Sequence, residues 1–221
     1  SMGIYLFKRN VMEELLHNFP KHTDFGKDII PEALKIKKVH SYIFRGYWED
    51  IGTIKSFYRA NLALCEHPNP SFSFFDEKFP IYSRPRFLPP SKIINSHIEK
   101  SMISNGCIIR SCNIKNSIIG IRSRLCENSS LENVLYMGAD FYQSDLERSR
   151  DIQSKIPPVG LGENSIIKNA IIDKNTRIGK NVKIINKKNI QNKDREKEGY
   201  CIRNGIVIII KNAIIPDNTI F

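Results

Sequence analysis

The sequence has few cysteines and no long apolar run, and both shortages narrow the class of protein. Its five cysteines stand at irregular spacings without a CxxC pair, which argues against a disulfide framework or zinc site and favours free thiols in a reducing compartment. The longest apolar run, Ile206 to Ile210, is far shorter than the roughly 20 residues that span a bilayer. No secretory signal pattern opens the chain. We therefore expect a soluble globular protein without a membrane partner.

The familiar signatures of catalysis and phosphate binding are also missing, because the sequence contains no nucleophile elbow, P-loop or dinucleotide glycine fingerprint. Its five histidines are scattered without metal-ligand spacing, which favours surface or packing roles. Positive charge, in contrast, is in excess. The net charge of +11 calls for an anionic partner, and since the basic residues form no block, small phosphates are favoured over nucleic acid.

The beginning of the 221-residue chain has the pattern of part of an α/β layer. The residues predict a buried strand over 1–7, an amphipathic helix over 11–19, short helical structure over 24–36 and a strand over 39–44. A further helix, capped by Thr53, is expected to reach Leu64. These elements are too few for a complete α/β domain, and the abrupt apolar start suggests a cut chain.

The stretch Gly46–Thr53 carries the first candidate site. In an extended segment successive side chains face opposite sides, so Trp48 and Asp50 share one face while Glu49 lies on the other. An acid beside a tryptophan, between two glycines, suits a sugar and a hard cation. The alternative interpretation is the end of a strand with two solvated acids.

Beyond an extended, proline-rich strap over 72–90, aliphatic residues recur every five or six positions, an interval that neither a helix nor an alternating strand produces. Six is the period of the hexapeptide β-helix, in which successive coils pair in parallel and stack aliphatic side chains inward. An irregular β-sandwich is the alternative. The expected inward residues are Ile98, Ile103, Ile109, Ile114, Ile119, Leu125 and Leu131, then Ile166, Ile172, Ile178 and Ile184, and finally Ile202, Ile208, Ile214 and Ile220.

Two charged segments, 143–154 and 187–199, interrupt this pattern, and we interpret them as excursions from the coils, the first of them helical. His97 stands at the first coil. Because some hexapeptide acyltransferases use a histidine base on their β-helix, an acyltransferase is a distant alternative.

Lys174 and Lys211 are the main basic candidates, since each projects from a different β-helix segment. Arg84 and Arg86 project from one side of the strap. Together these four side chains are candidates for a phosphate site, because arginine supplies bidentate donors and lysine a mobile charge. The alternative for each lysine is a solvated surface position.

Several motifs, in order along the whole chain, resemble the carboxy-terminal half of glucose-1-phosphate adenylyltransferase, or ADP-glucose pyrophosphorylase, of the cyanobacterial and plastid type. They are Ser1–Tyr5, Asp24–Gly26, Tyr47–Thr53, Arg86–Pro90, Met137–Asp140, Ile171–Asn175 and Ile202–Val207. The resemblance implies an α/β remnant of a nucleotidyltransferase domain followed by a left-handed parallel β-helix of hexapeptide repeats. The expected divisions are the nucleotidyltransferase part over 1–67, a linker strap over 68–92 and a regulatory and oligomerisation β-helix over 93–221.

The resemblance also implies a reaction in which glucose 1-phosphate attacks the α-phosphate of ATP, giving pyrophosphate and ADP-glucose for glycogen or starch synthesis, with Mg²⁺ bridging the phosphates. The family's aspartate matching Asp50 is catalytic, helps to hold the metal and lies near the sugar phosphate. The serine matching Ser1 contacts glucose, and Trp48 shapes that pocket.

For regulation, the resemblance implies that Lys174 and Lys211 bind the activator 3-phosphoglycerate. Arg86, with Arg84 beside it, is associated with inhibition by inorganic phosphate. The implied assembly is a homo- or heterotetramer, in the cytoplasm of a bacterium or the stroma of a plastid.

One departure from the family concerns the catalytic apparatus. The family's glycine-rich nucleotide loop and its other catalytic residues lie upstream of the serine matching Ser1, and these 221 residues contain no such region. We therefore expect the chain alone to be inactive. The alternative is a noncatalytic regulatory and assembly module that binds phosphate effectors and a catalytic partner.

Overall fold

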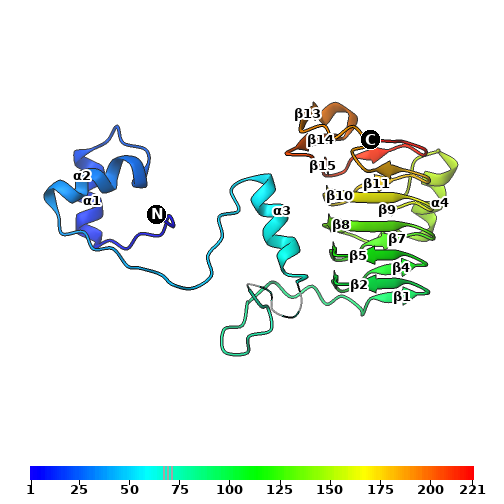
Figure 1. Cartoon of the computed structure of the whole chain (residues 1–221), viewed down its shortest axis with the longest axis horizontal. Coiled ribbons are helices and arrows are strands. Elements are labelled where there is room, and N and C mark those ends of the chain that lie inside the picture. The colour runs from blue at the N-terminus through cyan, green and yellow to red at the C-terminus, as the bar shows by residue number, and fades with distance from the viewer. Residues whose placement is uncertain (67, 69, 71) are drawn as a thin grey trace. The chain divides into compact units, whose positions relative to one another are not determined.

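A computed structural model describes every residue except 67, 69 and 71. The chain forms two compact units, Ser1–Asp50 and Ile51–Phe221, which Figure 1 colours from blue at the N-terminus to red at the C-terminus. The predicted domain boundary at residue 67 lies outside the described residues. Among the residues that are described, no helix combines the length and the apolar character that crossing a bilayer demands.

The first unit is built from α1 (Arg9–Asn18), the π-helical turn η1 (Phe25–Ile29) and α2 (Ile30–Ile36). Its small core consists of Leu15, Ile29 and Ala33, which are buried. The helices predicted over 11–19 and 24–36 are therefore confirmed. The side chain of Asp24 accepts a hydrogen bond from the Lys27 amide at 2.8 Å and caps η1.

The strands predicted over 1–7 and 39–44 are wrong, because neither segment has regular secondary structure. The side chains of Ile4, Leu6, Tyr42 and Ile43 are exposed. A strand needs a neighbouring strand for its backbone hydrogen bonds, and the described residues of this unit provide none. Apolar composition alone is therefore not enough to identify a strand in these two segments.

The helix α3 (Ile54–Ala63) begins at the predicted cap, where the Thr53 side chain accepts from the Ser56 amide and the Ser56 side chain accepts from the Thr53 amide. It packs against the outer surface of the β-helix within the second unit. The Tyr58 hydroxyl donates to the Asn133 carbonyl at 2.6 Å, and burial raises the pKa of Tyr58 to about 12. The aliphatic residues in this cluster are Leu135, Ile171 and Ile206, with Ile118, Met137 and Ile208 around them.

The predicted parallel β-helix is confirmed by the pairing of the strands that follow the strap. One sheet has the order β1-β4-β7-β9-β11-β16, the other β13-β14-β15-β10-β8-β5-β2 with β3, β6 and β12 attached. Pairing is parallel throughout except for the β13-β14-β15 meander. The strands are β1 (Lys92–Ile94), β2 (His97–Glu99), β3 (Met102–Ile103), β4 (Ile108–Arg110), β5 (Asn113–Lys115), β6 (Ile118–Ile119), β7 (Arg124–Leu125), β8 (Ser130–Tyr136), β9 (Gly160–Leu161), β10 (Ile166–Ile172), β11 (Arg177–Ile178), β12 (Lys183–Ile184), β13 (Asn192–Arg195), β14 (Tyr200–Arg203), β15 (Ile206–Ile209) and β16 (Ile214–Ile215).

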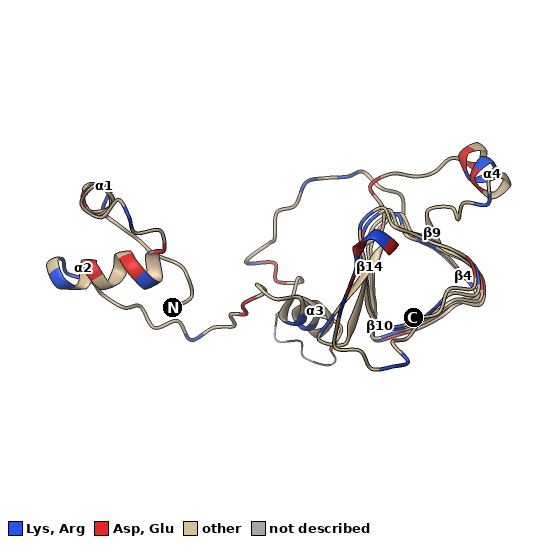
Figure 2. Ribbon diagram, turned by 90° about the horizontal axis from the view of Figure 1, so that it is seen from above, with Lys and Arg blue, Asp and Glu red and all other residues tan. Residues whose placement is uncertain are grey.

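Both predicted excursions leave the stacked coils. The first contains α4 (Asp145–Gln153), as predicted, with a capping box between Ser144 and Glu147. Figure 2 looks along the stack and shows α4 outside the coils. The second contains β13 and the short helix η2 (Glu196–Glu198), so it forms an antiparallel hairpin with β14 rather than a simple loop.

The inward ladder is predicted correctly in its early coils and out of phase later. The predicted residues from Ile109 to Leu131 are buried, as are Ile172, Ile178, Ile184 and Ile202, whereas Ile98 and Ile103 are partly buried. Ile166, Ile208, Ile214 and Ile220 are not buried, and the buried neighbours are Ile167, Val207, Ile209 and Ile215. Adjacent isoleucines place aliphatic groups on both faces of a strand, so the period alone selected the wrong member of the pair.

Asparagines occupy left-handed corners of the β-helix and form ladders between coils. Asn133 and Asn169 have φ values of +54° and +50°, a region that asparagine tolerates better than most residues. Asn116 donates from Nδ2 to Oδ1 of Asn133 at 2.7 Å, and Asn133 donates in turn to Asn169 at 3.0 Å. The same bond joins Asn128 to Asn164, Asn175 to Asn212, and Asn181 to Asn218.

Asn133 offers a test that separates backbone conformation from the amide ladder. Asn133→Gly removes the ladder bonds, each worth about 1 kcal/mol, and keeps a residue that enters the left-handed region without strain. Asn133→Ala also forces a Cβ into the left-handed region, so its free energy of unfolding in urea should be lower than that of the glycine variant by about 1 kcal/mol. Equal stability of the two variants would contradict the conformational explanation.

Candidate functional site

The candidate effector site is a column of turns that follow β8, β10 and β15. The Asn175 amide donates to the Gly138 carbonyl and the Asn212 amide to the Lys174 carbonyl, each at 3.0 Å. These bonds stack three successive turns. Parallel register therefore places residues that are far apart in the sequence at one corner of the β-helix.

Three charged side chains meet at this corner. Lys174 Nζ lies 2.8 Å from Oδ1 of Asp140, and Lys211 Nζ lies 3.2 Å from Oδ2 of the same carboxylate. Asn175 also donates to Asp140 at 3.1 Å. The two lysines singled out in the sequence are thus brought together, and the three formal charges sum to one positive charge.

The electrostatics favour an ionised Asp140. The hydrogen bond from Lys174, helped by those from Asn175 and Lys211, lowers the pKa of Asp140 to about 2 despite some desolvation. All three charged side chains remain partly accessible, so the ion pairs are solvent-screened and modest in strength. Because each lysine ammonium group is mobile, it can leave the Asp140 carboxylate and bind a phosphate oxygen instead.

The predicted arginines have different surroundings. Arg84 and Arg86 are both exposed, and Arg86 Nη1 donates to the carbonyl oxygen of Arg84 at 3.3 Å. The described contacts of the strap's end are with the first coil, where the Gly106 amide donates to the Pro89 carbonyl at 2.8 Å. Among the residues that the structure describes, no hydrogen bond or ion pair joins either arginine to the lysine corner, so their effector role stays a prediction.

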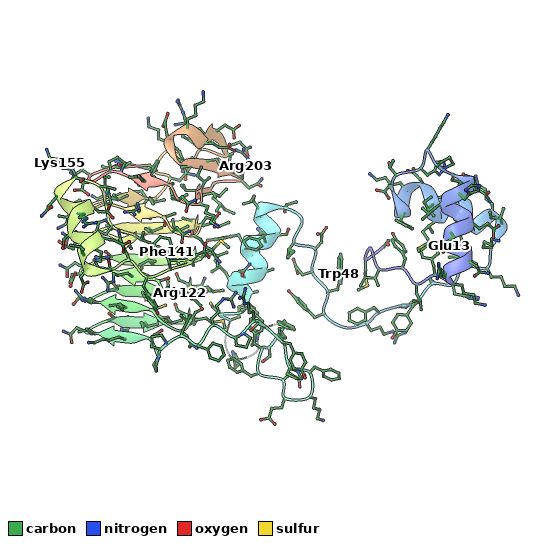
Figure 3. All side chains as sticks on the ribbon, turned by 180° about the vertical axis from the view of Figure 1, so that it is seen from behind. Glu13, Trp48, Arg122, Phe141, Lys155 and Arg203 are labelled. Carbon is green, nitrogen blue, oxygen red and sulfur yellow. The ribbon has the colours of Figure 1, made fainter. Side chains whose placement is uncertain are left out.

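The Gly46–Thr53 stretch has no regular secondary structure, and Trp48 is labelled on it in Figure 3. Trp48 and Asp50 are exposed, and Ser1 Oγ shares a hydrogen bond with Tyr5 Oη at 2.9 Å. Across the described residues, no group of three or more histidines, cysteines or acids could hold a metal by itself. Mg²⁺ commonly takes one or two carboxylates together with substrate phosphates, so Asp50 fits a role as a single protein ligand.

Asp140 is the one member of the corner that the sequence reasoning left out of the site. The number of residues between equivalent positions on successive coils could have identified it. Asp140 precedes Lys174 by 34 positions and Asn175 precedes Asn212 by 37, close to the 36 and 37 that separate other asparagine pairs. Recognising that spacing as one coil with its insertion would have placed the carboxylate beside the lysine.

The fold of the second unit is a parallel β-helix that carries the lysine corner on one edge. Two family models match the chain. The model described as Nucleotidyl transferase matches residues 1–67, and that described as GLGC left-handed parallel beta-helix domain matches residues 86–220. The chain belongs to the family of the GLGC left-handed parallel beta-helix domain. Helix α3 falls within the first match yet packs on the β-helix.

The pKa of Asp140 provides a direct check of the corner. Titration of its carboxyl carbon by NMR should give a pKa near 2, and Lys174→Met should raise it more than Lys211→Met, because Lys174 is the stronger influence. Since the folded-state pKa lies below the ordinary 3.8, the pair's contribution to stability is present above pH 3.8 and lost as pH falls toward 2. Lys168→Met, which breaks the separate pair with Glu132, is the matched control. An unchanged Asp140 pKa in the Lys174 variant would refute the geometry.

Proposed function

We propose that this chain is part of a regulated nucleotidyltransferase that makes ADP-glucose from ATP and glucose 1-phosphate, the glucose-1-phosphate adenylyltransferase of cyanobacterial and plastid type. The family matches support the coarser class, sugar-nucleotide synthesis. The observation that carries the finer proposal is the convergence of Lys174 and Lys211 on Asp140. At this corner a phosphate group can replace Asp140 as the partner of the two lysines, and the corner lies on the domain expected to regulate the enzyme.

On the catalytic side, Asp50 is the proposed protein ligand of Mg²⁺. When bound, the metal neutralises charge on the phosphates during nucleotidyl transfer. Trp48, on the same segment, offers an exposed apolar face for glucose, and the Ser1 hydroxyl offers a hydrogen bond to the sugar. The side chains thus bind and orient the sugar phosphate and the metal.

On the regulatory side, Lys174 and Lys211 are the proposed ligands for the phosphate of 3-phosphoglycerate. In the absence of an effector, Asp140 holds both ammonium groups at the corner. The two lysine side chains therefore lose less conformational entropy when the effector binds. Arg84 and Arg86, with no described carboxylate partner, are proposed to respond to inorganic phosphate from the strap. We place the enzyme, as a homo- or heterotetramer, in a bacterial cytoplasm or a plastid stroma.

The second candidate is a noncatalytic regulatory module that binds a phosphate effector and a catalytic partner. One observation favours it. The corner formed by Asp140, Lys174 and Lys211 is complete within the β-helix, whereas Asp50 belongs to no described cluster able to hold a metal alone.

The regulatory role is tested by Lys211→Ala in a complete enzyme that carries this chain. Loss of one of two phosphate ligands should raise the concentration of 3-phosphoglycerate needed for half-maximal activation by about tenfold, since a charge-assisted bond contributes about 1.5–3 kcal/mol. Turnover without activator should stay nearly unchanged. Lys168→Ala, a lysine of the outer β-helix surface, is the control. Equal losses of activated and unactivated turnover would mean a structural role.

The catalytic role is tested with the 221 residues alone. They contain no glycine-rich nucleotide loop, so a coupled assay of pyrophosphate release should show no ADP-glucose formation above background. Measurable formation from this chain by itself would refute the division of the active site that we propose.

A further inference from the structure

Arg122 belongs to the same column of turns as the lysine corner. The Ala139 amide donates to the Ile121 carbonyl at 2.9 Å, so the turn of Ile121 and Arg122 stacks directly against the turn that carries Asp140. The turns of the two lysines continue this stack on the other side of Asp140. Arg122 is therefore a third cation on the edge of the β-helix that the corner occupies.

The guanidinium group of Arg122 is held at the turn of Asp140. Nη1 of Arg122 donates to the Ala139 carbonyl at 3.4 Å, and its Cζ lies 5.7 Å from the centre of the Tyr142 ring. The Tyr142 hydroxyl donates to the Gly106 carbonyl at 3.0 Å, which fixes the position of that ring. The guanidinium group is therefore bonded to the peptide unit that leads into Asp140.

The backbone conformation of Arg122 is an unfavourable one for arginine. Its φ is +58°, and the equivalent residues of other coils in this column are Gly106, Asn175 and Asn212, with φ values of +76°, +60° and +62°. Glycine and asparagine enter this left-handed region more readily than residues with long side chains. An unfavourable conformation at such a position points to a role for the side chain.

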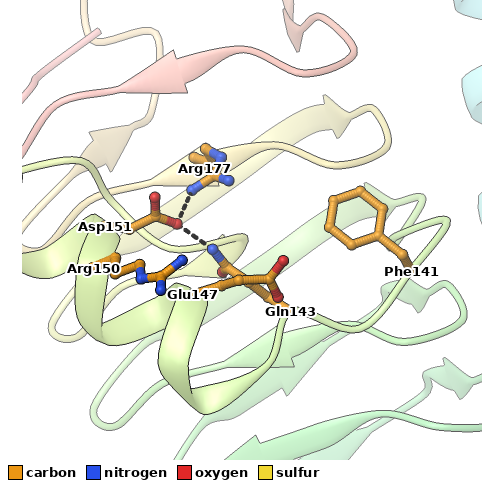
Figure 4. A pocket seen from close by; sticks show the side chains of 6 residues that line it. All are labelled: Phe141, Gln143, Glu147, Arg150, Asp151 and Arg177. Atoms are coloured by element: carbon orange, nitrogen blue, oxygen red, sulfur yellow. Dashed lines mark hydrogen bonds and ion pairs between the residues drawn. The ribbon is translucent and has the colours of Figure 1, made fainter.

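The half-buried guanidinium group of Arg122 also has donors to spare. Among the described residues, its one hydrogen-bond acceptor is Ala139, and no carboxylate lies within ion-pair distance of it. Arg177, which is likewise half-buried, differs in both respects. Its Nη1 lies 2.6 Å from the Asp151 carboxylate, as Figure 4 shows, and donates to the Pro157 carbonyl at 3.0 Å. Arg122 therefore has the unused donors that an anionic ligand requires.

We propose that Arg122 binds a second anionic group of the effector whose phosphate binds Lys174 and Lys211. The proposal rests on the effector role proposed above for the two lysines. Because the stacked turns lie about 5 Å apart, a ligand a few carbon atoms long reaches from the lysine pair to the guanidinium group. The planar fork of arginine matches a carboxylate, whereas a lysine pair suits a phosphate. The ligand class is thus a small phosphorylated carboxylic acid.

Two ligands that differ only in the second anionic group test this role of Arg122. Glycerol 3-phosphate has a CH2OH group where 3-phosphoglycerate has its carboxylate. In calorimetric titrations, the 221-residue chain should bind 3-phosphoglycerate more tightly by about tenfold, since a charge-assisted bond to the carboxylate is lost with glycerol 3-phosphate. In Arg122→Gln, the affinity for 3-phosphoglycerate should fall to that for glycerol 3-phosphate, which should stay unchanged.

The variants are chosen to leave the fold intact. Glutamine places the same Cβ in the left-handed region as arginine, so Arg122→Gln adds no backbone strain, and circular dichroism confirms its folding. Arg110→Gln, which changes an exposed arginine of β4 that pairs with Glu127, is the matched control and should keep the full preference for 3-phosphoglycerate. Arg122→Lys should keep part of the preference, because lysine retains the charge without the fork.

The outcomes separate the role of Arg122 from that of the lysines. Equal affinities for the two ligands in the wild type, or an unchanged preference in Arg122→Gln, would overturn the role of Arg122 alone. Equal losses of affinity for both ligands in Arg122→Gln would also overturn it, because they would mean that Arg122 only supports the turn of Asp140. Failure of the wild type to bind either ligand would overturn the lysine site and this proposal with it.

Discussion

The parallel register between coils is the constraint on which the second unit depends. Each coil must turn at corners where the backbone enters the left-handed region, and asparagine makes this turn while its amide bonds to the asparagine above or below. Because the turns stack, residues roughly one coil apart in the sequence lie next to each other. The inner aliphatic column and the corner formed by Asp140, Lys174 and Lys211 are two consequences of that single geometry.

The outer face of the same strands links the corner to the nucleotidyltransferase segment. Met137, Ile171 and Ile208 each lie three positions before a residue of the corner, and all three belong to the apolar cluster that holds α3. Helix α3 follows directly on Gly46–Thr53, which carries Asp50.

The sequence predicts the β-helix, α1, α3 and α4 well because their signals are periodic or local: aliphatic spacing, a threonine cap and a serine–glutamate capping box. The predictions that failed concern features that depend on contacts between residues far apart in the sequence. Segments 1–7 and 39–44 resemble strands, but strand formation requires a neighbour that composition cannot reveal. Ile166 and Ile167 are equally apolar, and only the register decides which one is buried. The pairing of both lysines with Asp140 likewise follows from coil length, which the insertions disguise.

We propose that the stacked corner, through its two lysines, binds phosphate-bearing effectors. Calorimetric titration of 3-phosphoglycerate into the 221-residue chain tests it most directly, with the wild type compared to Lys174→Met/Lys211→Met and to Lys115→Met/Lys168→Met, which removes two lysines from the outer sheet surface. We expect binding by the wild type and by the outer-surface variant, and loss of binding in the corner variant. Equal heats of binding in all three proteins would contradict it.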